Sequence, residues 1–99
     1  MCKINFLLQA IEDIEEAATW YAQFDLHLSE RFKYQVFSAI EGLNSDIVGY
    51  YPVYRGLSRV CVKRYPYSVY FIKEPLLNTI TVFAVLHERQ DTQKLDTRI

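Results

Sequence analysis

The sequence predicts an α+β fold in which an N-terminal helical hairpin packs on a mainly antiparallel, twisted sheet of about four strands. Up to about residue 44, apolar residues recur at spacings of three and four, which is typical of amphipathic helices. Two later runs, Arg59–Ile72 and Thr79–His87, are rich in Val, Ile, Tyr and Phe, as strands are. The chain has 99 residues, which suits a single domain over 1–99 with its own hydrophobic core.

The first half of the chain is expected to form one strand and two helices. Residues 1–7 are short, apolar and β-prone. A helix is predicted from Leu8 to about Phe24, with its acids near the start, where the helix dipole favours them. Asp25 is a candidate N-cap for a second helix from about Leu26 to Asn44. The residues expected to face the core are Ile11, Ile14, Ala18 and Tyr21, and then Leu28, Phe32, Val36, Ala39, Ile40 and Leu43.

The second half begins with segments of weaker pattern. The stretch Ile47–Pro52 contains Gly49 and is expected to be an irregular connector. Val53–Arg55 is predicted to be a short edge strand, after which Gly56 turns the chain. A strand is then expected over Leu57–Arg64, because apolar and basic residues alternate along it.

Proline at position 66 ends that strand, because it has no N–H group to donate to a sheet ladder. The following run, Tyr67–Ile72, is apolar on both faces and is therefore predicted to be the central strand. Thr79–Leu86 is expected to be a third, largely buried strand of the same antiparallel meander. The tail, Glu88–Ile99, is polar and is expected to be either a short helix or loose.

Charge is divided unequally between the two halves, although the net charge is only −1. Residues 8–46 carry eight acids and two bases, whereas residues 55–73 carry five bases and no acid. Arg59, Cys61 and Lys63 share one face of their predicted strand. We therefore expect the sheet face opposite the helices to be left open and cationic, facing an anionic macromolecule. The alternative is that the two halves only neutralise each other.

Several classes of protein are disfavoured by the sequence. No run reaches the roughly 20 apolar residues that a membrane span needs, and the N-terminus does not resemble a secretory signal. Cys2 and Cys61 lie far apart without metal-ligand spacing, so both are expected to be reduced thiols of a cytoplasmic protein. Neither His27 nor His87 has a ligand-spaced partner, and we expect no metal and no cofactor.

Two segments resemble a known family when they are taken in order. They are the junction Tyr65-Pro66-Tyr67 within Arg59–Tyr70, and the ending Ala84–Asp91, in which His87 is followed eleven residues later by Arg98. With the preceding helical hairpin, which carries Trp20-Tyr21, they resemble the ParE/RelE superfamily of toxins from type II toxin–antitoxin systems. The ending departs from the family pattern: Gln90, Thr92 and Leu95 stand where arginine, proline and tryptophan are common.

The resemblance implies a small α+β toxin with a role in growth inhibition or plasmid stabilization, neutralised by an acidic, partly disordered antitoxin. ParE-type members bind DNA gyrase, and RelE-type members cleave mRNA on the ribosome. The ParE-type action is favoured, and a non-toxic relative that only binds an antitoxin is a further alternative. The residues expected to bind antitoxin or target are Arg59, Lys63, Arg64, Arg89 and Arg98.

If the chain were a nuclease, His87 and Arg89 would be its catalytic candidates. A histidine can exchange a proton near neutral pH, and an arginine can neutralise phosphate charge. Two groups that RelE-type nucleases carry are missing, because Ser68 stands at the arginine position and no tyrosine follows Tyr70. The alternatives are a structural His87 bonded to the backbone, and tyrosines such as Tyr65 and Tyr67 that belong to the core rather than stack on bases.

Overall fold

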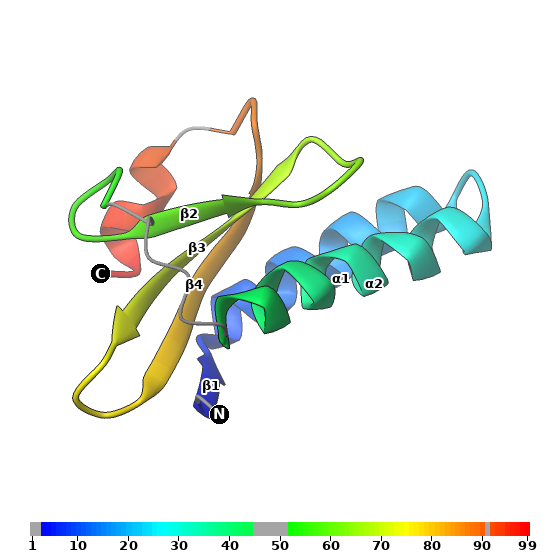
Figure 1. Ribbon diagram of the computed structural model, residues 1–99. Helices are drawn as coiled ribbons and strands as arrows, with labels where there is room; N and C mark the ends of the chain where they lie inside the picture. Colours follow the sequence, from blue (N-terminus) through cyan, green and yellow to red (C-terminus); the bar gives the residue numbers. More distant parts are fainter. Residues whose placement is uncertain (1–2, 45–51, 91) are drawn as a thin grey trace.

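The computed structural model describes residues 3–44, 52–90 and 92–99. Within them the fold is the predicted α+β type, with two helices followed by a four-stranded sheet (Figure 1). The elements in chain order are β1 (Lys3–Phe6), α1 (Leu8–Ala22), α2 (Leu26–Glu41), η1 (Gly42–Asn44), β2 (Ser58–Cys61), β3 (Tyr67–Glu74), β4 (Thr79–His87) and η2 (Thr92–Thr97). Cys2 and most of the expected connector, residues 47–51, lie outside the described residues.

The sheet has the strand order β1-β4-β3-β2. Strands β2, β3 and β4 form the predicted antiparallel meander, with β3 in the centre, and β1 adds to β4 in parallel. A register shift lies between Tyr70 and Phe71, where β3 and β4 slip by one residue. Both helices cover one side of this sheet, and the tip of their hairpin extends beyond it (Figure 1).

The helices begin and end close to the predicted positions. Asp25 is the N-cap of α2, as expected, because its carboxylate accepts a hydrogen bond from the backbone N–H of His27 at 2.9 Å. The prediction that Ile11 and Leu28 face the core was wrong, because Ile11 is 45% exposed and Leu28 is 36% exposed. Ala10 and Ala17 are buried instead, because the small residues of α1 let it approach the sheet closely.

The helix-facing core joins α1 and α2 to β3 and β4. Ile14, Phe32 and Val36 pack against Val69 and Val85 of the sheet. At one end of this core the rings of Tyr21, Phe32, Tyr65 and Tyr67 contact one another with centroid distances between 5.0 and 6.3 Å. The tyrosines at the Pro66 junction therefore belong to the core edge, which was the alternative to a base-stacking surface.

The opposite face of the sheet carries a second core. Tyr70, Ala84 and Leu86 are buried there beneath Leu57 and Leu95. The expectation of an open cationic face was therefore wrong. Strands that are apolar on both faces need cover on both, and η2 supplies it on the side away from the helices (Figure 1).

The segments around β2 also differ from the prediction. Residues 53–55 are not a strand: only Tyr54 and Leu57 form a bridge, across a tight turn in which Arg55 and Gly56 have positive φ angles of 48° and 86°. β2 ends at Cys61 rather than Arg64, because the turn that accommodates Pro66 already starts at Val62. Lys63 and Arg64 therefore lie in a turn, with Arg64 at φ 70°.

Candidate binding surface at one end of the sheet

Two turns lie next to each other where β3 begins and β4 ends. Tyr67 pairs with His87, and the backbone N–H of Glu88 donates to the carbonyl of Pro66 at 2.8 Å. The turn before Tyr67 carries Lys63 and Arg64, and the turn after His87 carries Arg89. All three are exposed, as is Arg59 on the edge strand β2. We call these four residues, Arg59, Lys63, Arg64 and Arg89, the basic end.

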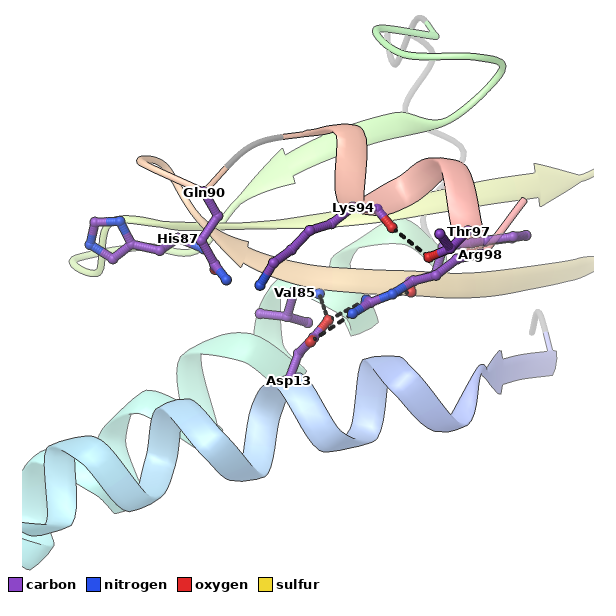
Figure 2. Close-up of polar contacts among 8 residues, drawn as sticks. Asp13, Val85, His87, Gln90, Lys94, Thr97 and Arg98 are labelled. Carbon is purple, nitrogen blue, oxygen red and sulfur yellow. Dashed lines mark hydrogen bonds and ion pairs between the residues drawn. The ribbon is translucent and has the colours of Figure 1, made fainter.

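Arg98, the fifth predicted binding residue, lies apart from the basic end. Its guanidinium holds the carboxylate of Asp13 on α1 in a two-pronged ion pair, with N–O distances of 2.5 and 3.0 Å (Figure 2). The same guanidinium donates to the carbonyl of Phe83 at 3.2 Å. The side chains of Arg98 and Asp13 are only 12% and 13% exposed. Arg98 therefore links η2 to α1, and its positive charge is neutralised by Asp13.

The side chains of Asp13 and Gln90 accept hydrogen bonds from backbone N–H groups on the edge of β4. The parallel strand β1 pairs with β4 only as far as Val82, which leaves the backbone of Val85 and His87 without a strand partner on that side. The Val85 N–H donates to the Asp13 carboxylate at 3.0 Å, and the His87 N–H donates to the Gln90 side-chain oxygen at 2.6 Å (Figure 2). Side chains thus replace a strand along this edge. Sequence reasoning missed these roles because nothing in the spacing links Asp13 to the tail.

His87 has the geometry of a structural residue. Its Nδ1 accepts a hydrogen bond from the backbone N–H of Arg89 at 3.0 Å, and its ring lies edge-on to Tyr67 with a centroid distance of 5.1 Å. Because a backbone N–H can only donate, Nδ1 must be the acceptor, so in the neutral ring the proton sits on Nε2. The remaining nitrogen can then donate a hydrogen bond but cannot accept one.

A groove of about 830 Å³ lies between α1 and this end of the sheet, and we call it the α1 groove. One wall comes from α1 and includes Glu16 and Trp20, and the other includes Tyr67, His87 and Lys94. Burial, followed by the nearby Glu16 carboxylate, raises the pKa of Tyr67 above its ordinary value of 10.0. Burial also raises the pKa of Tyr21, to which Tyr67 and Tyr65 add. Both phenols are thus kept neutral.

The described residues provide neither a metal site nor a membrane-spanning helix. Within residues 3–44, 52–90 and 92–99, no group of three or more His, Cys, Asp or Glu side chains could hold a metal ion. Neither of the helices described there has the length and apolar composition that a membrane-spanning helix requires.

Comparison with known proteins identifies a structural relative. No protein-family model matches the sequence, and no curated protein matches it. A chain of the solved structure described as a chromosomal ParDE TA system from P. aeruginosa is similar, with a TM-score of 0.74. The match covers 88% of this chain and 96% of that chain, at 13% sequence identity. The similarity confirms the ParE/RelE-like fold that the sequence motifs implied.

Proposed function

We propose that this chain is the toxin of a type II toxin–antitoxin pair, acts in the cytoplasm and is neutralised by a cognate antitoxin. The observation that carries the proposal is the shared fold with a chain of a ParDE system, which extends over nearly all of both chains. The sequence motifs at Tyr65–Tyr67 and His87–Arg89 support it, because they meet at one end of the fold.

Within this class, the ParE-like action on DNA gyrase is favoured over RNA cleavage. An RNase of the RelE type needs a group that takes the proton of the 2′-hydroxyl. His87 is the nearest candidate, and its Nδ1 is already occupied by the Arg89 N–H. Ser68, at the position where the nucleases carry arginine, is half-buried and its hydroxyl contacts the Cys61 sulfur at 4.0 Å. Arg89 alone does not supply acid–base chemistry.

The basic end is the surface proposed to meet a partner. Its four cations are exposed and come from β2 and from two adjacent turns. An acidic, partly disordered antitoxin segment that crosses the outer surface of the helices and reaches Arg59, Lys63 and Arg64 would place opposite charges together. Arg98 is not part of this proposal, because it is paired with Asp13.

The assignment is tested by expressing the chain and then assaying the purified protein against two targets. We expect growth arrest on expression, inhibition of gyrase supercoiling, and no ribosome-dependent cleavage of mRNA. The variant His87→Ala should keep its toxicity, because the proposal gives this ring no chemical step. Cleavage of mRNA without any effect on gyrase would instead establish the RelE-type action, and normal growth would favour a non-toxic, antitoxin-binding relative.

A further inference from the structure

In the part of the chain that the structure describes, the α1 groove contains one carboxylate that no cation neutralises. Asp13 is paired with Arg98, and Glu15 lies 3.4 Å from Lys33. Glu16 also lines the groove, and no Lys, Arg or His in the described parts of the chain lies within 4.0 Å of its carboxylate. An unpaired carboxylate in a concave site is a position where a ligand can supply the missing positive charge.

The aromatic residues Trp20 and Tyr67 line the groove together with Glu16. Trp20 is one helical turn after Glu16, so both project from the same side of α1 into the groove. Tyr67 faces them from the sheet, close enough that the Glu16 charge affects its pKa. Trp20 is 53% exposed, although its ring also contacts Tyr21 and Phe24 at centroid distances of 5.1 and 5.0 Å, so part of its surface is accessible to an incoming group. A carboxylate beside tryptophan and tyrosine is an arrangement that attracts cations by charge and by the ring quadrupole together.

The shape of the groove suits a side chain that arrives on a polypeptide. The lining residues from α1 and its C-cap run from Asp13 to Gln23, which corresponds to about 15 Å of helix. Among the described residues that line the groove, the only lysine or arginine is Lys94 of η2, and η2 is linked to α1 at Asp13. Glu16 and Trp20 follow Asp13 along α1 toward the hairpin tip, so the α1 wall of this part of the groove is anionic and aromatic.

We propose that the α1 groove binds an arginine side chain of a protein partner, with the guanidinium against Trp20 and Tyr67 and hydrogen-bonded to Glu16. A planar guanidinium can stack on a ring and donate to a carboxylate at the same time, which an ammonium cannot. The inference stands independently of the toxin assignment, because binding is a property of the groove itself.

The test uses Trp20 as its reporter, since it is the only tryptophan of the chain. Titration with Nα-acetyl-arginine amide should change the tryptophan emission saturably. The citrulline analogue, which has the same shape without the charge, should bind about tenfold more weakly or not at all. Glu16→Gln should reduce arginine binding by a similar factor. Glu12→Gln, an exposed acid of the same helix that does not line the groove, should leave it unchanged.

Four outcomes would overturn the proposal. The first three are equal responses to arginine and citrulline, unchanged binding by Glu16→Gln, and tighter binding of Nα-acetyl-glutamate amide, which would assign the groove to Lys94 instead. The absence of any saturable response to arginine would do the same. Circular dichroism on Glu16→Gln verifies that the fold is intact, which is expected because Glu16 is exposed.

Discussion

The carboxylate of Asp13 contacts two separate parts of the chain, β4 and the tail. It accepts hydrogen bonds from the guanidinium of Arg98 and from the backbone of Val85, and Arg98 in turn reaches the carbonyl of Phe83. Almost all of this lies away from solvent, where a charge that loses its partner is costly. The pair therefore links α1, β4 and the tail, although each partner looks like an ordinary surface residue in the sequence.

Removing the cation from this pair should destabilise the fold. We expect Arg98→Met to lower the free energy of unfolding by about 3 kcal/mol, because Asp13 is left charged and mostly buried. Urea denaturation monitored by circular dichroism measures the change. Arg89→Met is the matched control, since Arg89 is exposed, and it should stay within about 0.5 kcal/mol of the wild type. Equal effects of the two variants would contradict a structural role for Arg98.

A second prediction concerns Asp96 and the stability of the protein at acidic pH. A hydrogen bond from Tyr54, at 2.6 Å, and then one from Arg55 lower the pKa of Asp96 below its ordinary value of 3.8. A carboxyl group whose pKa is lower in the folded state stabilises the protein above the unfolded value, and this contribution is lost as the pH falls through the folded pKa.

The stability difference between wild type and Asp96→Asn should therefore be constant above about pH 4 and shrink as the pH falls below it. Urea denaturation at a series of pH values tests this, with Asp25→Asn as a control of the same charge change. A difference that persists unchanged down to pH 2 would show that the Asp96 charge is not what connects residues 54 and 55 to η2.

Among the elements, those with strong periodicity were predictable and those held by a few contacts were not. The two helices follow from a stripe of three- and four-residue spacings, and β3 follows from its apolar residues on both faces. β2 was overextended, because alternation continues in the sequence through Lys63 although the Pro66 turn has already begun. The tail could not be decided, because only Leu95 identifies it as structured, and one leucine is too weak a signal.

Leu95 should therefore be the residue that fixes η2. It is fully buried against Leu57, Tyr70 and Leu86. Truncation to alanine should cost about 3 kcal/mol, because it removes buried methyl groups and leaves a cavity. In the Leu95→Ala variant, amide hydrogen exchange should be accelerated more in residues 92–99 than in β3. Leu76→Ala, in the exposed turn between β3 and β4, is the control, and comparable losses would indicate that η2 is not anchored through this core.

At the scale of the whole molecule, the sequence predicted the fold and part of the candidate site. The basic end was foreseen for Arg59, Lys63 and Arg64, which are close in sequence, and for Arg89 through the resemblance of the ending. Arg98 was placed with them because spacing alone cannot show which carboxylate pairs with it. The α1 groove was not foreseen at all, because its walls come from residues 13–23, 66–67 and 85–94, which only the folded chain brings together.

Binding of an acidic antitoxin should depend on the charge of the basic end. Reversal of three cations, Arg59→Glu with Lys63→Glu and Arg64→Glu, should weaken binding at least about tenfold, and added salt should weaken wild-type binding. Isothermal titration calorimetry measures both effects. Single charge reversals give a matched comparison. Arg64→Glu should weaken antitoxin binding more than Lys3→Glu, because Lys3 lies on the opposite edge of the sheet. Salt-insensitive binding that survives the triple reversal would show that the antitoxin does not use this surface.

The contact between Asp13 and Arg98 also bears on when the protein can finish folding. The two residues are separated by 85 positions in the chain. A growing polypeptide cannot form this contact until Arg98 has left the ribosome, so until then the nascent chain carries an unpaired Asp13 carboxylate. Any partner that binds the chain before the Asp13–Arg98 contact forms would therefore meet this protein before its folding is complete.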